Sequence, residues 1–326
     1  MTDNLITRRE SLTTIGAATA GLLTWNVLRR PAAASVPSDG RKRAIRIAHL
    51  TDIHVEPELH AGEGMAACLR HVHQLADPPE LIITGGDAIM ESLGTDDART
   101  QVQWDLWKRI LKNECSIPVR SCIGNHDIWG WAKSKSGTTG NEPLWGKKRA
   151  VAMLGLEDRY YRFSQAGWEF IILDSTQPLP GGGGGYSAYL DEEQYDWLTH
   201  ALRDVPADTP VMIVSHIPIL STTPLIGEPG DDGNSIVSRA ALHIDRLKLK
   251  KLFARHPNVR ICLSGHIHLL DRVDYNGVTY LCNGAVCGNW WGGRHIDCDE
   301  GYAIIDLYDD GSFDHQYLTY GWEATG

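Results

Sequence analysis

Five short segments of this chain are built around residue types that bind metal ions, and most of them follow an apolar run. They are Asp52-Ile53-His54, Gly86-Asp87, Gly124-Asn125-His126-Asp127, Ser215-His216 and Gly265-His266-Ile267-His268. Carboxylate, amide and imidazole ligands without thiolate suit manganese, iron or zinc, and they discriminate poorly among the three. Each segment alone is weak evidence. Together they indicate a pocket for two metal ions, and such a pocket points to hydrolysis of a phosphate ester.

The spacing within two of these segments favours convergence on a small volume. Asp52 and His54 are two residues apart, as are His266 and His268. In an extended backbone, side chains two apart leave on the same side, so each pair is expected to face one point. Glycines beside the segments allow tight backbone turns there; they are Gly85, Gly86, Gly124 and Gly265.

The elements that must position these segments are short strands alternating with helices. Apolar runs predict strands at 45–50, 81–84, 118–123, 168–174, 211–215 and 259–264. Apolar periodicity predicts helices at 65–75, 101–111, 191–202 and 238–254, the third capped by Asp191. The stretches 129–150, 177–185 and 220–234 interrupt this pattern and are expected to be loops.

The C-terminal part of the chain is predicted to form β-hairpins. Strands are predicted at 272–275, 278–282, 302–307 and 313–320, with turns at Asn276-Gly277 and Asp310-Gly311. Alternating strands and helices followed by hairpins favour a mixed α/β (α+β) domain over a purely parallel sheet. In such sheets the ligand crevice lies beyond the carboxyl ends of the strands, where most of the five segments are expected. We predict one catalytic domain over residues 43–320.

The first 34 residues have the character of an export signal. The segment 7–12 carries Arg8 and Arg9, an uncharged and mildly apolar run follows to Leu28, and Pro31-Ala32-Ala33-Ala34 is a plausible cleavage site. This arrangement resembles a twin-arginine signal peptide, although Ser11 stands where that family usually has Phe. It implies an exported protein, periplasmic or extracellular in a bacterium. An uncleaved membrane anchor and a disordered basic start are the alternatives.

Composition limits the partners. With 42% hydrophobic and 22% charged residues the chain is typical of a globular protein, and its net charge of −10 argues against binding a long nucleic acid through a broad basic face. No later stretch approaches the ~20 apolar residues that a membrane span requires. The sequence does not set the oligomeric state. Three of the seven cysteines cluster near the C-terminus, where they could form a disulfide after export or remain thiols; they are Cys282, Cys287 and Cys298.

Taken in order, the five segments resemble the motifs of the calcineurin-like metallophosphoesterase superfamily over roughly residues 44–320. The resemblance implies a double β-sheet sandwich flanked by helices, with the metals at one edge. It implies that Asp52, His54 and His268 hold one metal ion, that Asn125, His216 and His266 hold the second, and that Asp87 bridges them. It also implies that His126 is the catalytic histidine, oriented by Asp127.

The chemistry implied by this resemblance is attack by a hydroxide, formed between the two metal ions, on a phosphodiester or phosphomonoester of a small molecule or nucleotide. Asn125 would hold a phosphoryl oxygen, and His126 would protonate or stabilise the leaving oxygen. The Asp-x-His motif, and the lack of a tyrosine soon after Asp87, separate the chain from purple acid phosphatases. The alternative is a non-catalytic metal-binding or scaffold protein on the same fold.

Substrate contacts are expected from the glycine-rich stretch 284–295. Trp290 or Trp291 could stack on a base or sugar, and Arg294 could meet a second phosphate. The alternative is that both tryptophans pack against the core. The expected partner is therefore a small phosphorylated substrate, with no long nucleic acid and no stable membrane span after signal cleavage.

Overall fold

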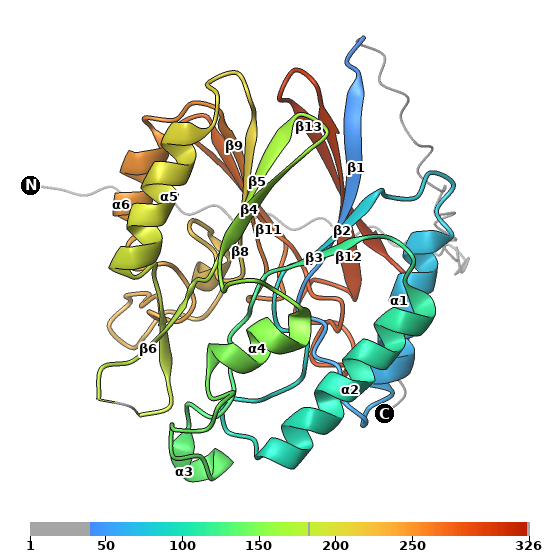
Figure 1. Cartoon of the computed structure of the whole chain (residues 1–326), viewed down its shortest axis with the longest axis vertical. Coiled ribbons are helices and arrows are strands. Elements are labelled where there is room, and N and C mark those ends of the chain that lie inside the picture. The colour runs from blue at the N-terminus through green and yellow to red at the C-terminus, as the bar shows by residue number, and fades with distance from the viewer. Residues whose placement is uncertain (1–39, 182, 325–326) are drawn as a thin grey trace, which may run out of the picture. The chain divides into compact units, whose positions relative to one another are not determined.

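Two β-sheets lie face to face in the computed structural model, which describes residues 40–181 and 183–324 (Figure 1). The first sheet has the strand order β13-β12-β1-β2-β3. Its strands are β1 (Arg43–Leu50), β2 (Leu81–Thr84), β3 (Val119–Ser121), β12 (Gly301–Tyr308) and β13 (Phe313–Thr319). Strands β1, β2 and β3 are parallel, whereas β12 and β13 add antiparallel pairs.

The second sheet has the order β10-β11-β9-β8-β5-β4. Its strands are β4 (Tyr161–Gln165), β5 (Trp168–Leu173), β8 (Val211–Ser215), β9 (Val259–Ser264), β10 (Asp271–Tyr275) and β11 (Val278–Cys282). The four central strands β11, β9, β8 and β5 are parallel. A separate hairpin pairs β6 (Thr176–Pro178) with β7 (Tyr186–Ala188).

Alternation of apolar side chains explains why the sheets pack as a sandwich. In β1, Ile45 and Ile47 face the second sheet and pack with residues such as Phe170 and Val214. Ala48 and Leu50 of the same strand belong to a different buried cluster, on the outer face. Strands that are apolar on both faces must be covered on both sides, so each sheet also carries a layer of helices.

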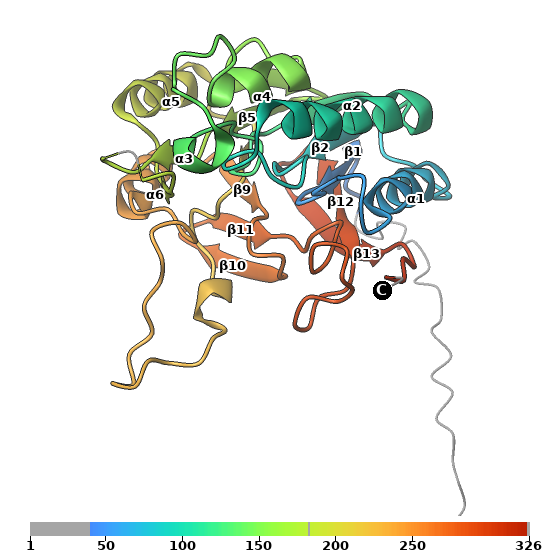
Figure 2. The same cartoon turned by 90° about the horizontal axis from the view of Figure 1, so that it is seen from below.

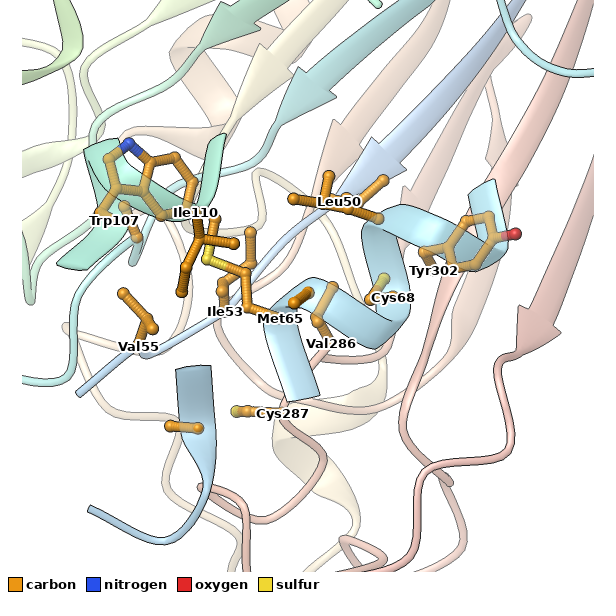
Figure 3. Close-up of a cluster of buried hydrophobic side chains, with 14 of the residues drawn as sticks. Leu50, Ile53, Val55, Met65, Cys68, Trp107, Ile110, Val286, Cys287 and Tyr302 are labelled. Atoms are coloured by element: carbon orange, nitrogen blue, oxygen red, sulfur yellow. The ribbon is translucent and has the colours of Figure 1, made fainter. Parts of the chain in front are cut away.

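Helices α1 (Ala61–His73) and α2 (Asp97–Glu114) cover the first sheet. Figure 3 shows part of this cluster, with Met65 of α1, Trp107 of α2 and Leu50 of β1. Helices α5 (Glu192–Asp204) and α6 (Arg246–Phe253) cover the second sheet. The short elements α3 (Lys133–Ser136), α4 (Lys147–Leu154) and the 3-10 turn η1 (Thr223–Leu225) lie in the connections. The expected sandwich of sheets flanked by helices is therefore confirmed.

Some element predictions were wrong. The helix expected at 238–254 is present only as α6, because the preceding backbone bonds elsewhere: His243 N–H donates to the Pro218 carbonyl and Ile244 N–H to that of Ala188. The expected loop at 129–150 contains α3 and the start of α4, and the glycine-rich loop closes the β6–β7 hairpin. The predicted cap is confirmed, since the Asp191 side chain accepts from Gln194 N–H.

Two further predictions concern the chain as a whole. No helix within residues 40–181 and 183–324 is long and apolar enough to cross a membrane. The predicted signal peptide, residues 1–34, lies outside the residues that the structure describes.

Candidate functional site

The loops that follow five parallel strands meet at one edge of the sandwich. Asp52 follows β1, Asp87 follows β2, Asn125 follows β3, His216 follows β8, and His266 and His268 follow β9. Carboxyl ends of parallel strands lie on the same edge of a sheet, and the two sheets bring both sets of loops together. The structure thus gathers the seven side chains predicted to bind metal from positions more than 200 residues apart.

Asp87 occupies the centre of this group. Its Oδ2 atom lies 3.6 Å from Nε2 of His54 and 3.1 Å from Nε2 of His216. His266 completes one set with Asp87 and His216, in which potential ligand atoms lie within 4.8 Å of one another. On the other side, Oδ1 of Asp52 is 3.3 Å from Nε2 of His268 and 3.9 Å from Nε2 of His54.

The backbone around these side chains is strained. Asp52, His54, Asp87, His266 and His268 all have positive φ, between 48° and 71°. Such φ values are costly for residues other than glycine and persist where the surroundings hold them, often at functional sites. The extended backbone expected around Asp52–His54 and His266–His268 was therefore wrong: each pair converges through left-handed turns.

Glycine is required at two positions where the backbone passes very close to a side chain of the site. At Gly86, with φ of 102°, a Cβ atom would collide with the His216 ring. At Gly124 it would collide with the Asp87 carboxylate. Only glycine lets these loops pass so near the two side chains.

The protonation states of the buried groups are strongly perturbed. Burial opposes charge on His216, but the carboxylates of Asp87 and Asp52 raise its pKa to about 9. Burial lowers the pKa of His266 to about 3 and holds that of His54 well below its ordinary value. Burial also opposes charge on His268, but Cys287 and Asp52 raise its pKa above the ordinary value.

These residues fit bound cations. Both ring nitrogens of His54 are buried and have no hydrogen-bond partner among the described residues. A buried imidazole without partners is costly, and a metal ion would satisfy one nitrogen. Divalent cations could also replace the protons that balance Asp52 and Asp87, because metal binding to such sites releases protons. Nitrogen and oxygen donors from histidine, aspartate and asparagine suit manganese, iron or zinc.

His126 lies beside this group and is half-buried. Its ring centroid is 4.6 Å from that of His54, and its Nδ1 atom is 2.6 Å from the Met90 carbonyl oxygen. Oε2 of Glu91 lies 3.5 Å from the same Nδ1 atom. The sequence analysis missed both Met90 and Glu91. Their position four residues or fewer after Asp87 was the only signal.

Asp127 does not orient His126 as the resemblance implied. Its buried carboxylate accepts hydrogen bonds from the backbone N–H groups of Gly124, Asp87 and Ala88, at 2.8 Å, 3.0 Å and 2.8 Å. Burial and the charge of Asp87 raise the pKa of Asp127 to about 7. Asp127 therefore ties together the two loops that present Asp87 and Asn125.

The two candidate tryptophans occupy different environments. Trp290 is 39% exposed, and its ring centroid lies 4.6 Å from that of His268, one of the seven predicted metal ligands. Trp291 is only 2% exposed and donates from Nε1 to the His54 carbonyl. The expectation that Trp291 contacts substrate was wrong, because its ring belongs to the core cluster beneath α1 and α2.

Arg294 is exposed and interacts with its own loop. Its Nη2 donates to the Asp297 carbonyl at 2.8 Å, and Nε lies 3.6 Å from Oδ1 of Asp299.

The seven cysteines are free thiols, so the disulfide considered from the sequence among Cys282, Cys287 and Cys298 is not formed. Cys287 lies instead beside the site, with Sγ 4.0 Å from Nδ1 of His268.

Known proteins match this chain over most of its length. It is 25% identical over 288 residues to a 3′,5′-cyclic-nucleotide phosphodiesterase of Nostoc sp. (strain PCC 7120), covering 83% of this chain and 91% of that protein. It is 24% identical over 264 residues to the 3′,5′-cyclic adenosine monophosphate phosphodiesterase CpdA of Escherichia coli K12, covering 78% and 80%. These relatives indicate that the chain is a hydrolase acting on phosphate esters.

A solved structure supports the fold. A dimetal phosphatase from Danio rerio superposes with a TM-score of 0.57 at 13% identity, covering 85% of this chain and 96% of that one. The family model described as calcineurin-like phosphoesterase matches residues 45–270, which include every predicted metal ligand. The chain belongs to the calcineurin-like phosphoesterase family.

Proposed function

We propose that this chain hydrolyses a phosphodiester of a small molecule, and that its substrate is a cyclic nucleotide. The observation that carries the proposal is the position of Asp87, whose carboxylate faces His54 on one side and His216 on the other. A carboxylate between two sets of imidazoles is suited to bridge two cations. Relatives named as cyclic-nucleotide phosphodiesterases support the choice of a diester.

In this proposal the seven ligands are shared between two cations in the way that the family resemblance implies. One cation would be held by Asp52, His54, His268 and Asp87, and the other by Asp87, Asn125, His216 and His266. Bound manganese, iron or zinc ions would act as Lewis acids and lower the pKa of a water molecule toward neutrality.

The remaining steps depend on atoms of the protein itself. Oδ1 of Asn125 faces His216 at 3.1 Å, so its amide nitrogen is free to donate to a phosphoryl oxygen. Nδ1 of His126 donates to the Met90 carbonyl, so Nε2 is the nitrogen available to protonate the leaving oxygen. Trp290 offers an exposed ring on which a base could stack. Arg294 could turn toward a second phosphate only by leaving its contacts to Asp297 and Asp299.

The test combines metal analysis with substrate comparison. The purified protein is stripped with a chelator, reloaded separately with manganese, iron or zinc, and assayed on nitrophenyl phosphate, its diester and cyclic nucleotides. We expect two metal ions per chain and faster hydrolysis of diesters than of monoesters. Asp87→Asn should lose both metal and activity, whereas Asp208→Asn, at an exposed carboxylate, should lose neither. A metal-loaded protein that hydrolyses no ester would instead favour the non-catalytic alternative.

We also propose that the protein is exported by the twin-arginine route, so that it acts in the periplasm or outside a bacterial cell. The support is the sequence from Thr7 to Ala34, with Arg8 and Arg9 before the uncharged run. Replacing both arginines with lysine should leave the precursor in the cytoplasm, as measured by cell fractionation. The same change at Arg29 and Arg30 is the control. Export unaffected by the change at Arg8 and Arg9 would contradict this route.

A further inference from the structure

One surface of the second sheet has a charge opposite to that of the chain as a whole. The segment 239–260 contains seven lysines and arginines and a single carboxylate, Asp245, in a chain of net charge −10. That carboxylate is already engaged, since it accepts from Leu190 N–H and lies 2.9 Å from Nδ1 of His243. Helix α6 itself therefore carries cations and no carboxylate.

Exposed apolar side chains accompany these cations. Seven of the twelve large hydrophobic residues that are exposed in the described part of the chain lie between residues 225 and 275. Ile236 is 90% exposed and Leu247, on α6, is 57% exposed. Exposed apolar side chains mark a site of interaction where they gather into one patch instead of lying singly.

Two hollows connect the apolar and basic groups. The first, of about 550 Å³, is lined by Ile236, Ile244 and Leu242 together with Arg239 and Arg246. The second, of about 390 Å³, is lined by Leu220, Leu247, Val273, Tyr275 and others, together with Arg246 and Lys250. Arg246 borders both, so the hollows adjoin and form one basic–apolar face.

This face is fixed to the body of the protein at its base. The loop between β8 and α6, yellow-orange in Figure 2, stands out from the sheets. Where this loop comes back to the second sheet, just before α6, Nε2 of His243 lies 3.1 Å from Oγ of Ser215, and the His243 N–H donates to the Pro218 carbonyl. The carboxylates of the loop, Glu228, Asp231 and Asp232, line neither hollow.

We propose that the basic–apolar face docks on an anionic phospholipid surface. Ile236, Ile244 and Leu247 would enter the boundary between headgroups and acyl chains, and the surrounding lysines and arginines would meet lipid phosphates. The apolar side chains protrude among cations, whereas the core of a protein interface is depleted of charge. The proposal does not depend on which ester the metal site hydrolyses.

Vesicle flotation tests this proposal with the full chain. The vesicles contain either phosphatidylcholine alone or equal parts of phosphatidylcholine and phosphatidylglycerol. We expect binding to the mixed vesicles only, weakening as salt rises because surface charges are screened. Arg246→Glu with Lys250→Glu, two cations that line the hollows, should lower the partition coefficient at least about tenfold. The control pair Lys108→Glu with Lys112→Glu has the same spacing of four residues and lies on α2, and it should change the coefficient less than about twofold.

A second variant tests the apolar part of the face. Ile236→Ser with Leu247→Ser should weaken vesicle binding at low and high salt alike, with ester hydrolysis and thermal unfolding unchanged because both side chains are exposed. Equal binding to both kinds of vesicle, or equal effects of the two charge-reversal pairs, would overturn the proposal. So would a dimer, seen by size-exclusion chromatography, that this variant converts to a monomer without any vesicle binding.

Discussion

The ring of His126 is held by the main chain of Met90, whose carbonyl oxygen lies 2.6 Å from Nδ1. Met90 belongs to the same loop as Asp87, and the His126 N–H donates to Oδ1 of Asp87 at 2.8 Å. The candidate catalytic histidine and the candidate bridging carboxylate are therefore positioned by one another's loops. A change at His126 can therefore displace Asp87, and a change at Asp87 can displace His126, so activity and metal content report on the two residues only when both are measured.

We expect His126→Ala to lower kcat by about 10²–10⁴, the usual contribution of a general acid. Metal content should remain near two ions per chain, although His126 lies within 4.8 Å of ligand atoms on His54 and Asp87. Steady-state kinetics and elemental analysis of the same sample measure both quantities, with the exposed His200→Ala as control. Full activity in His126→Ala would refute its catalytic role, and loss of metal would make it a ligand instead.

Asp127→Ala should reduce both stability and metal content. The substitution leaves the buried N–H groups of Gly124, Asp87 and Ala88 without their acceptor. Each such loss costs about 1–3 kcal/mol, so we expect the free energy of unfolding to fall by about 3 kcal/mol or more. Urea denaturation and metal analysis are the measurements. A variant that keeps its metal and stability but loses turnover would restore the role implied by family resemblance.

Substitution of the two adjacent tryptophans should have different consequences. Trp290→Ala removes an exposed ring, so we expect KM for a cyclic nucleotide to rise about fivefold or more through lost base stacking. KM for ribose 3′,5′-cyclic phosphate, which lacks a base, serves as the control and should change little. An equal rise for both substrates would argue against stacking.

Trp291→Ala should act on stability. The ring is buried against α1 and bonded to the His54 carbonyl, so its removal should lower the free energy of unfolding by about 3–5 kcal/mol. Urea denaturation measures the change, and Trp290→Ala is the matched control. Comparable stabilities of the two variants would contradict the different environments of these side chains.

His315 should contribute a pH dependence to stability. Burial lowers its pKa to about 4, whereas an unfolded histidine titrates near 6.5. Between these values the unfolded chain binds a proton that the folded chain does not, so stability falls as pH falls from about 6.5 to about 4. The expected contribution is about 3 kcal/mol across this range.

His315→Gln provides the comparison for this prediction. Glutamine retains an N–H donor toward Oδ1 of Asn283, which lies 2.8 Å from Nε2 of His315, but it does not titrate. Urea denaturation at several pH values should show a flatter dependence in the variant. Part of the slope should remain, since burial also lowers the pKa of His49 to about 3. Identical pH profiles for the variant and the parent chain would show that His315 contributes nothing.

Local sequence was sufficient for the strands that build the site. The ranges 81–84, 211–215, 259–264 and 278–282 agree with β2, β8, β9 and β11, because a continuous apolar run is buried on both faces where the other sheet covers one side and helices cover the other. The cap at Asp191 also followed from local chemistry, since its carboxylate needs only the N–H of Gln194 three residues on. The residue types of the five segments were enough to suggest metal binding.

The tertiary structure alone decided which residues distant in the sequence these side chains and backbone groups contact. Trp290 and Trp291 are adjacent and of one type, yet only packing against α1 determines that one ring is buried and the other exposed. Residues 239–245 have helical periodicity, but hydrogen bonds to Pro218 and Ala188 hold them out of the helix. Asp127 accepts backbone N–H groups from a loop 40 residues away rather than contacting the ring of its neighbour. Periodicity and propensity describe neighbours along the chain, whereas burial and hydrogen-bond satisfaction depend on neighbours in space.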